Sequence, residues 1–397
     1  MDAMNKISLE QILQLFNVSQ ETVRLWEKKG LIKTISFERG HKWFSYNEIV
    51  NIVNGSANRY RIIVSPKQSK FSVIELFSGA GGLALGLKHA GLNAKMLVEI
   101  DRDAAKTLKI NNPDWNVIHD DIKNVSFKGI SSDVVAGGFP CQAFSSAGKK
   151  QGFEDERGNL FFEFLRAIRE IKPKIIVAEN VKGLEKHNNG KTLKIILDCL
   201  IEAGYKVNYR ILRSQFLDVP QKRERIVIIG TRIDLNIPIF FPKEKDYYVS
   251  LKEALHNVPL SDGIKYNDKK KAIMDLIPEG GYWKDLPEEI KKEYMGKSFY
   301  LGGGKTGVAR RLSMKEPSLT LTCSPAQKQT ERCHPIETRP LTIREYARIQ
   351  CFPDNWIFTG SVLSQYRQIG NAVPVNLGYH IGQAIIAMLE NKLDLEN

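Results

Sequence analysis

Cysteine is scarce in this sequence, and the cysteines present form none of the usual structural patterns. The 397 residues contain five, without a CxxC pair, at positions 141, 199, 323, 333 and 351. An odd, scattered set argues against a disulfide framework and favours a reducing compartment. Cys323, Cys333 and His334 in CSPAQKQTERCH could bind a metal, but they lack a partner CxxC, so we expect no metal site.

Long apolar runs are also missing. No stretch approaches the ~18 residues of a membrane-spanning helix, and the N-terminus has no apolar signal-peptide core. Hydrophobic residues make up 42% of the chain and charged residues 26%. That balance is typical of a soluble globular protein, and the length suffices for two or three domains. We expect a cytoplasmic protein with no membrane partner.

Negative charge is the third shortage. Asp and Glu number 45 against 58 Lys and Arg, which gives a formal net charge of +13. Such a surplus favours a polyanionic partner, above all nucleic acid. The alternative is a lysine-rich surface that serves only solubility.

The first block, residues 1–65, has the pattern of a DNA-binding module. SLEQILQLF has the apolar spacing of a short amphipathic helix, and Ser19 can cap a second helix that Gly30 ends. Two short helices joined by a tight polar turn indicate a helix-turn-helix, and ISFERGHKWFSYNEIVNIV predicts a basic hairpin and a further helix after it. The block resembles the winged DNA-binding domains of the MerR type, and a plain helical cap is the alternative. SPKQSK (65–70) is predicted to be a linker.

From Phe71 onward, short strand and helix segments alternate. FSVIELF, AKMLVEI, VIHDDI, DVVAGGF, KIIVAEN and RIVIIGT have strand character. This rhythm predicts a mostly parallel sheet covered by helices, an α/β domain over residues 71–235. Residues 236–340 are irregular and rich in Lys, Gly, Tyr and Pro, which predicts a separate loop-rich domain. Helical patterning returns over residues 341–397, which we assign to the sheet domain.

A glycine-rich turn, ELFSGAGG, follows the first strand of this block and opens a helix. Such turns let a ligand approach backbone N–H groups at a helix N-terminus, although the spacing here is tighter than GxGxxG. Glu99 ends the next strand and suits ribose hydroxyls, while Asp120 and Asp121 end the third, where one could meet an adenine amino group. Each acid alone is typical of a solvated loop. In series, they indicate a nucleoside-bearing ligand.

Cys141 lies in GGFPCQAFSSAGK, among small and polar residues rather than aliphatic ones. Pro140 restricts the local backbone, and the glycines allow close approach. A thiol reacts as the thiolate, which a basic or polar setting favours. By itself the pattern leaves two roles open, a nucleophile and a structural residue.

Three charged residues supply further context for this thiol. Glu179 ends the strand KIIVAEN, where a carboxylate could hydrogen-bond to a heterocycle or protonate it. Arg223 and Arg225 begin another strand, and alternation places both on one face. One guanidinium could hold a carbonyl oxygen. The alternative is an ion-paired, solvated sheet edge.

These residues, in this order, resemble the C5-cytosine DNA methyltransferases of bacterial restriction–modification systems. ELFSGAGGLALGLKHAG is similar to the family's first motif, GGFPCQAFSSAG to its catalytic motif, AENVKGL to its glutamate motif and QKRERIVIIG to its arginine motif. RRLSMKEPSLTLT and QIGNAVPV are similar to the last two motifs. The resemblance covers roughly Phe71 to Met388, and the N-terminal block is a departure from the minimal members.

The resemblance implies an enzyme that uses S-adenosylmethionine to methylate cytosine C5 in a specific double-stranded DNA sequence. The target cytosine would be flipped out of the duplex, and Cys141 would attack C6. Glu179 would contact N3 and the exocyclic amine, while Arg225, with Arg223 nearby, would hold O2. C5 then takes the methyl group, and loss of the C5 proton and of the thiol releases 5-methylcytosine. Such an enzyme protects host DNA from a cognate restriction endonuclease, and we expect a monomer during catalysis.

The resemblance also implies a fold and further site residues. The fold is a Rossmann-like class I methyltransferase sheet domain with a small loop-rich target-recognition domain. The implied cofactor residues are Phe77, Ser78, Gly79, Gly81, Leu83, Glu99, Ile100, Asp121, Asn371 and Val373. The segment 145–159 is similar to the loop that closes over DNA. The residues expected to contact DNA are Ser145, Lys149, Lys297, Lys305, Arg310 and Arg311.

Two other functions stay open. One is a helix-turn-helix regulator whose sheet domain only senses a nucleoside ligand. The other is a tRNA cytosine methyltransferase, because a related branch uses the same motifs on RNA. The sizeable insert and the N-terminal block favour DNA. For that block we predict transcriptional self-control through binding to the protein's own promoter.

Overall fold

The structure is a computed structural model of the whole chain. It describes residues 6–391 apart from 17–18, 29, 31, 39, 47, 50–58, 66, 141–159 and 301. The chain forms two compact units, Met1–Arg59 and Tyr60–Asn397. The division therefore falls after Arg59 rather than at residue 65, while the limits expected at 235 and 340 stay predictions.

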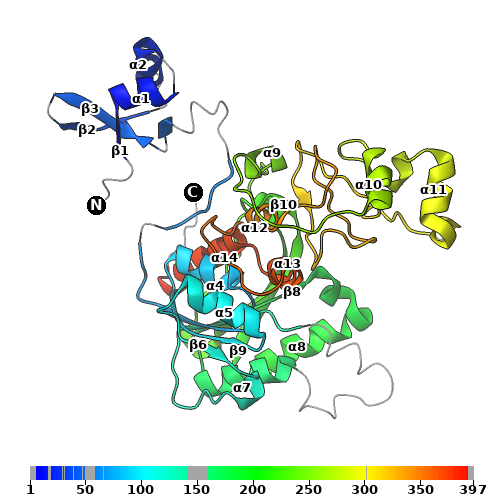
Figure 1. Cartoon of the computed structure of the whole chain (residues 1–397). Coiled ribbons are helices and arrows are strands. Elements are labelled where there is room, and N and C mark those ends of the chain that lie inside the picture. Colours follow the sequence, from blue (N-terminus) through cyan, green and yellow to red (C-terminus); the bar gives the residue numbers. More distant parts are fainter. Residues whose placement is uncertain are drawn as a thin grey trace. The chain divides into compact units, whose positions relative to one another are not determined.

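The smaller unit combines helices with a three-stranded antiparallel sheet (Figure 1). Helices α1 (Leu9–Phe16) and α2 (Gln20–Lys28) follow the short strand β1 (Lys6–Ser8). Strands β2 (Thr34–Glu38) and β3 (His41–Ser45) form the predicted hairpin, and β1 pairs with β3. Among the residues described in this unit, the buried apolar side chains are Ile7, Ile12, Val23, Ile32, Phe44 and Ile49.

The larger unit is built on a seven-stranded sheet in the order β6-β5-β4-β7-β8-β11-β9. Every strand runs parallel to the others except β11, which is antiparallel to both of its neighbours. The predicted mostly parallel sheet is confirmed. The strands are β4 (Ser72–Leu76), β5 (Asn93–Glu99), β6 (Val117–His119), β7 (Val134–Gly137), β8 (Ile175–Val181), β9 (Tyr205–Arg213) and β11 (Glu224–Arg232).

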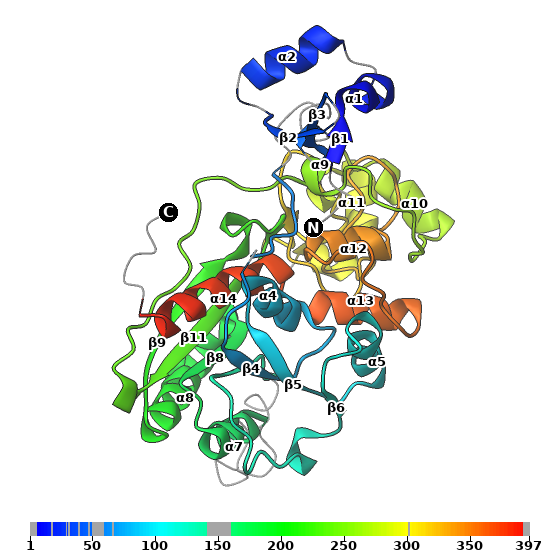
Figure 2. The same ribbon diagram turned by 90° about the vertical axis from the view of Figure 1, so that its left-hand side faces the viewer.

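Helices cover both faces of this sheet, because alternate strand residues point to opposite sides. Val73 and Ala136 contribute to the core under α4, α5 and α14, whereas Ile74 and Val135 contribute to the core under α7 and α8. Figure 2 shows the two layers. The helices are α4 (Gly82–Ala90), α5 (Arg102–Asn111), α7 (Leu160–Ile171), α8 (Lys191–Glu202) and α14 (Val375–Leu389).

Helix α14 packs closely along α4 (Figure 2). A Cβ added to Gly86 would lie 2.3 Å from the carbonyl oxygen of Val375, so only glycine permits this approach. Contrary to the expectation from the sequence, one stretch within the described chain, Val362–Leu389, is long and apolar enough to cross a membrane, but 72% of its most apolar part is buried inside the protein. Ala372–Pro374 divides it into α13 (Val362–Asn371) and α14, so it is part of the core.

Residues 236–340 hold little regular structure. The short elements there are α9 (Leu251–Ala254), α10 (Asp268–Asp275), α11 (Glu288–Met295) and β12 (Ser318–Leu319). The region has a core of its own, formed by Met274, Ile277, Trp283, Leu286, Met295, Val308, Ala309 and Cys333. Strand β12 pairs in parallel with β10 (Gln221–Lys222) in a separate two-stranded sheet, which joins the region to the segment just before β11. The 3₁₀ turns of the larger unit are Ile122–Asn124, Lys182–Gly190, Ser214–Phe216, Ile233–Leu235, Trp283–Asp285 and Gly296–Tyr300.

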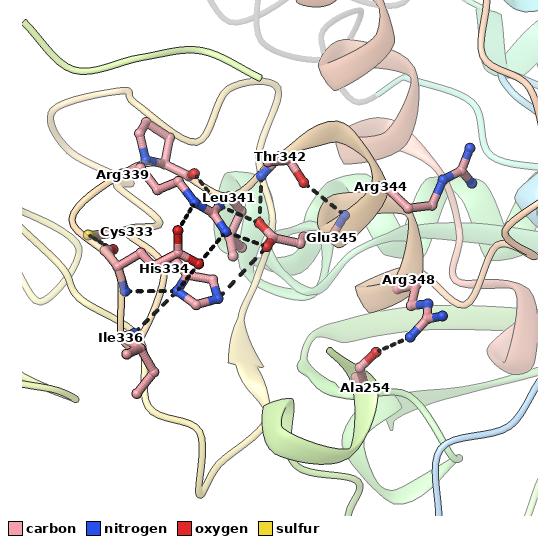
Figure 3. A network of polar contacts seen from close by, with 12 residues as sticks. Ala254, Cys333, His334, Ile336, Arg339, Leu341, Thr342, Arg344, Glu345 and Arg348 are labelled. Atoms are coloured by element: carbon pink, nitrogen blue, oxygen red, sulfur yellow. Dashed lines mark hydrogen bonds and ion pairs between the residues drawn. The ribbon is translucent and has the colours of Figure 1, made fainter. Parts of the chain in front are cut away.

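A polar network anchors the end of this region to helix α12 (Ile343–Ile349) (Figure 3). Glu345 accepts hydrogen bonds from Thr342 N at 2.7 Å and from Arg339 Nη1 and Nη2 at 2.8 Å each. His334 Nε2 lies 3.8 Å from the same carboxylate. Burial lowers the pKa of His334, while the bond to Glu345 raises the pKa of Arg339. The negative charge of Glu345 is therefore compensated by its hydrogen-bond donors. Because these donors come from Arg339 and Thr342, the network also fixes the direction in which the chain enters α12.

Candidate active site

A pocket of about 760 Å³ opens at the carboxyl ends of the parallel strands, the edge at which open α/β sheets bind ligands. It is lined by the glycine turn after β4, the ends of β5 and β8, the start of β11 and the segment between α13 and α14. Of the predicted cofactor residues, those in the lining are Phe77, Ser78, Gly79, Leu83, Glu99, Ile100, Asp121, Asn371 and Val373. The predicted catalytic residues Glu179, Arg223 and Arg225 line the same pocket.

The glycine turn is held in an unusual backbone conformation. Phe77, Gly79 and Gly81 all have positive φ, at 59°, 54° and 86°. For Phe77 this conformation is strained, and such strain concentrates at functional sites. Gly81 is outside the pocket lining, because its Cα faces the core: an added Cβ would lie 2.5 Å from Leu108 Cδ2. The turn therefore presents Ser78 and Gly79 to the pocket and Gly81 to the protein interior.

Glu99 connects the glycine turn to the start of α5. Its Oε2 accepts from Gly79 N and its Oε1 from Asp101 N, both at 2.6 Å. Burial raises the pKa of the carboxyl, although these two backbone donors oppose the rise. Next to it, the Ile100 side chain is 64% exposed and offers an apolar surface at the pocket.

Asp101 and Asp121 each cap a helical turn beside the pocket. Asp101 accepts from Ala104 N at the start of α5 and forms an ion pair with Arg367 at 2.9 Å. Asp121 accepts from Lys123 N at 3.0 Å. Arg367 is a lining residue that sequence reasoning did not single out, because a charged helical residue is usually solvated.

Glu75 is a second lining residue missed from the sequence. Its side chain is 4% exposed, and within the described chain its Oε2 has no hydrogen-bond partner. Burial, reinforced by the nearby Glu99, raises the pKa of Glu75 well above its ordinary value. Buried polar atoms are normally paired, so this oxygen suits a cationic ligand group. A carboxyl inside the apolar strand FSVIELF was the available signal.

Glu179 and Arg225 meet at the far side of the pocket. Arg225 Nε lies 2.9 Å from Glu179 Oε1, and both side chains are nearly buried. The antiparallel register of β11 on β8 brings them together, since Val227 is opposite Glu179 and Arg225 opposite Val181. This pairing keeps the carboxylate oriented toward the pocket without full exposure to water.

Arg223 precedes β11 and is buried more deeply. Its Nη1 donates to the carbonyl oxygen of Gly370 at 3.3 Å, and its Nε has no partner in the part of the chain that the structure describes. Burial, together with the charge on Arg225, lowers the pKa of Arg223 to about 9. The guanidinium thus connects the arginine segment with the loop that leads to Asn371.

Cys141, Ser145 and Lys149 lie outside the described residues. The chain that leads to Cys141 is described, and Gly138, Phe139 and Pro140 line the pocket. Asn180 Nδ2 donates to the carbonyl oxygen of Phe139 at 2.9 Å. A Cβ on Gly138 would lie 3.1 Å from Glu179 Oε2. The residue before Cys141 therefore belongs to the same pocket wall as Glu179.

The predicted DNA contacts in the loop-rich region have different environments. Lys297 is exposed. Lys305 Nζ donates to the carbonyl oxygen of Ser298, and the Arg310 guanidinium lies over the Tyr282 ring at 5.8 Å from its centre. None of these three residues lines the pocket.

The prediction that Arg311 contacts DNA is wrong. Its side chain is buried, with a residue exposure of 5%. Nε donates to the Ile277 carbonyl and Nη2 to the Met274 carbonyl, both at 2.7 Å, and Nη2 also reaches Thr338 Oγ1 at 2.8 Å. A guanidinium held by interior oxygens is unavailable to phosphate, so Arg311 stabilises the region.

The two cysteines of CSPAQKQTERCH are held by different groups. Cys333 is buried, with Sγ 3.7 Å from the carbonyl oxygen of Glu337. Cys323 is exposed, and its Sγ lies 3.2 Å from Asn371 Oδ1. Among the described residues, no group of three or more His, Cys, Asp or Glu side chains is arranged to hold a metal ion.

The sheet order, with one antiparallel strand between β8 and β9, and the pocket at the strand ends define a Rossmann-like methyltransferase. Among solved structures, the fold is similar to a prophage-encoded DNA modification methyltransferase of E. coli, with a TM-score of 0.60 and 26% identity over 81% of this chain and 100% of that one. It is also similar to a mutant form of Spodoptera frugiperda DNMT2, with a TM-score of 0.55 and 21% identity over 80% of this chain and 100% of that one.

The chain belongs to the C-5 cytosine-specific DNA methylase family, whose model matches residues 71–387. It is 49% identical to the type II methyltransferase M.Eco47II of Escherichia coli, over 97% of this chain and 96% of that one. It is 51% identical to M.PspPI of Psychrobacter sp., over 97% of each chain. It is 54% identical to M.Sau96I of Staphylococcus aureus, over 81% of this chain and 77% of that one. The protein is thus a type II DNA cytosine-5 methyltransferase that uses S-adenosylmethionine.

Proposed function

We propose that this enzyme methylates one cytosine within a specific double-stranded DNA sequence, with Cys141 as nucleophile, and protects host DNA from a paired restriction endonuclease. The supporting observation is a single pocket in which Glu99 and the glycine turn occupy one side and Glu179 and Arg225 the other. A methyl donor and a base held in one pocket can react directly. We place the enzyme in the cytoplasm, acting as a monomer.

The chain's residues fit S-adenosylmethionine, which when bound supplies an electrophilic methyl group. Glu99 is suited to accept from the ribose hydroxyls, Ile100 to pack on the adenine and Asp121 to accept from its amino group. The Oε2 of Glu75, which has no partner among the residues that the structure describes, fits the cationic end of the cofactor. The remaining residues that we assign to the cofactor site are Phe77, Ser78, Gly79, Gly81, Leu83, Asn371 and Val373.

On the other side, we assign Glu179 and Arg225 to a cytosine flipped out of the duplex. Glu179 contacts N3 and the exocyclic amine, and Arg225 holds O2. Arg223 adds positive charge beside them. The Glu179–Arg225 ion pair orients both groups before the base arrives, so little reorganisation remains for the reaction.

The thiolate of Cys141 attacks C6, and the ring electrons then make C5 nucleophilic. C5 takes the methyl group. A base removes the C5 proton, and the C6–sulfur bond breaks to return the thiolate and release 5-methylcytosine. The bond from Asn180 to the Phe139 carbonyl positions the chain just before Cys141 for this attack.

We assign duplex binding to Lys297, Lys305 and Arg310 in the target-recognition region, and to Ser145 and Lys149 in the segment 145–159. The exposed Lys297, the half-buried Lys305 and the stacked Arg310 suit phosphate and base-edge contacts.

For the smaller unit we propose a MerR-like helix-turn-helix that binds the enzyme's own promoter. Two helices followed by a hairpin support it, as do the exposed polar residues Gln20, Glu21, Arg24 and Lys28 on α2. Tyr60 Oη donates to the Arg348 carbonyl and Asn376 Nδ2 to the Arg61 carbonyl, so a deletion should end at Arg59. Deleting residues 1–59 should spare methylation and abolish promoter shifts. Lost catalysis without promoter binding by the intact protein would refute this role.

Bisulfite sequencing of DNA from expressing cells tests the methylation proposal and yields the modified sequence. The purified enzyme should transfer a labelled methyl group to that duplex and become covalently trapped on a 5-fluorocytosine version of it. Cys141→Ser should do neither. Wild-type transfer by this variant would exclude the nucleophile, and preferential labelling of tRNA in a competition assay would exclude DNA as the substrate.

A further inference from the structure

Two buried glutamines form a continuous hydrogen-bonded relay beside the pocket. Gln221 Nε2 donates to Gln350 Oε1 at 2.9 Å, and both residues are fully buried. Gln350 Nε2 in turn donates to the carbonyl oxygens of Ile369 at 2.7 Å and Ala372 at 3.2 Å. Gln221 Oε1 accepts from Leu321 N at 3.0 Å.

The relay has one direction only. If the Gln350 amide were reversed, its oxygen would face the carbonyl oxygens of Ile369 and Ala372, and its nitrogen would face the amide nitrogen Nε2 of Gln221. Both contacts would be unfavourable. In the observed arrangement each amide oxygen accepts a hydrogen bond and each amide nitrogen donates at least one, and buried amides left unpaired are costly. A shift of the Ile369–Ala372 carbonyls must therefore move Gln350, and with it Gln221.

One end of the relay lies against the cofactor side of the pocket. Gly370, Asn371, Ala372 and Val373 follow Ile369 and all line the pocket. The Val373 carbonyl is so close to the start of α4 that a Cβ on Gly82 would lie 2.0 Å from it. The segment that Gln350 holds therefore lines the same pocket as the glycine turn.

The other end lies in the arginine segment. Gln221 is separated from Arg223 by one residue, and Arg223 N donates to the Gln221 carbonyl at 2.9 Å. Arg223 Nη1 also bonds to Gly370, and Arg225 pairs with Glu179. Gln221 belongs to β10, which pairs with β12 of the target-recognition region. The segment 369–373, the arginine segment and the target-recognition region are therefore all connected through the Gln221–Gln350 amide pair.

We infer that the Gln221–Gln350 pair is a positioning relay that couples cofactor binding to target-DNA binding. The inference rests on the roles proposed above for Arg223 and Arg225. Neither glutamine touches a reacting atom. Each ligand stabilises the same arrangement of the segment 369–373 and the arginines, so each should tighten the binding of the other by the same factor.

The test measures the affinity of S-adenosylhomocysteine by titration calorimetry, with and without the duplex that bisulfite mapping identifies. Wild-type protein should bind this product at least about fivefold more tightly in the presence of the duplex. Gln350→Leu should reduce that ratio to within about twofold of one. Gln383→Leu is the matched control, because Gln383 Nε2 donates to the Ala90 carbonyl at 2.8 Å, at the end of α4 away from the pocket.

A wild-type ratio of one, or an unchanged ratio in Gln350→Leu, would overturn the relay. Melting curves show whether each variant folds, and Gln221→Met, which keeps the side-chain length, replaces Gln350→Leu if that variant does not. Arg225→Ala distinguishes a failure of the proposed target contacts from a failure of the relay. Wild-type turnover by Arg225→Ala would refute the proposed target contacts, whereas an inactive Arg225→Ala with an unchanged ratio in Gln350→Leu refutes the relay alone.

Discussion

The sheet-bearing part of the larger unit and the target-recognition region position their functional residues by different means. In the first, backbone ladders place Glu99, Glu179 and Arg225 at strand ends, so that chemistry follows from register. In the second, side chains hold the backbone. Arg311 bonds to interior carbonyls, and Arg332 donates from Nε to the Thr320 carbonyl at 3.1 Å.

Because of this difference, a charged residue in the sequence predicts a different role in each part. An acid at a parallel strand end is near the ligand edge of the sheet. An arginine in an irregular region is as often a replacement for missing ladder hydrogen bonds as a contact for DNA, because buried carbonyls need donors wherever a sheet does not supply them. Lys270 is also directed inward rather than toward DNA, since its Nζ pairs with the fully buried carboxylate of Glu331 at 2.6 Å.

The sharpest test of the sheet side is Glu179→Gln. Loss of the carboxylate should lower kcat by roughly 10²–10⁴-fold, as for other groups that assist proton transfer, with little change in melting temperature. Single-turnover methyl transfer measures it. Glu224→Gln is the control, because Glu224 is only half-buried and pairs only with Lys182 among the ion pairs of the described chain. Equal rates for the two variants would remove Glu179 from the reaction.

Arg311→Ala should reveal the structural role of arginine in the other region. It leaves the Ile277 and Met274 carbonyls without their donor, so we expect a loss of about 3 kcal/mol in the free energy of unfolding. Denaturant titration measures this loss. A stable Arg311→Ala protein with weakened DNA binding would contradict the assignment and restore the original DNA contact.

Its neighbour should behave in the opposite way. Arg310→Ala should change stability by less than about 1 kcal/mol, since it mainly removes a stacking contact with Tyr282. DNA affinity should fall roughly tenfold, and the slope of affinity against salt should decrease by about one charge. Fluorescence anisotropy at several salt concentrations measures both. Unchanged affinity and slope would show that Arg310 does not contact DNA and that the DNA-binding surface lies elsewhere in the region.

The smallest effect concerns Glu75. Because its folded-state pKa is raised above the ordinary 4.5, the folded protein holds this proton more tightly than the unfolded chain, and stability falls as pH rises above about 4.5. Glu75→Gln removes this penalty. It should melt at a higher temperature than wild type at pH 7 and at the same temperature below pH 4.5, while binding S-adenosylmethionine more weakly. Scanning calorimetry at both pH values, together with a binding titration, tests this; identical melting at pH 7 would contradict it.

Much of the sheet side could be predicted because its signals are local. An apolar run followed by glycines and an acid predicts a strand, a turn and the ligand-binding edge of the sheet. Strands β4, β5, β7, β8 and β11 are accordingly confirmed at the expected places. Strand β9 was not foreseen, although YKVNYRILR alternates exposed polar and partly buried residues in the pattern of an edge strand; the charged residues on its exposed face obscured the apolar run. The prediction for Arg311 was wrong for a related reason, since composition cannot tell an arginine that meets water from one that meets buried carbonyls.

The order of motifs along the chain, by itself, determined the family, the cofactor and the residues proposed for catalysis, because each motif is a short segment whose chemistry is complete in its own residues. Only the tertiary structure decided that one carboxyl oxygen of Glu75 has no partner among the described residues, that Arg225 pairs with Glu179, and that Gln221 and Gln350 join segments 129 positions apart. These relations depend on which buried donors and acceptors meet, and that is settled by packing between distant segments, where no local pattern in the sequence carries the information.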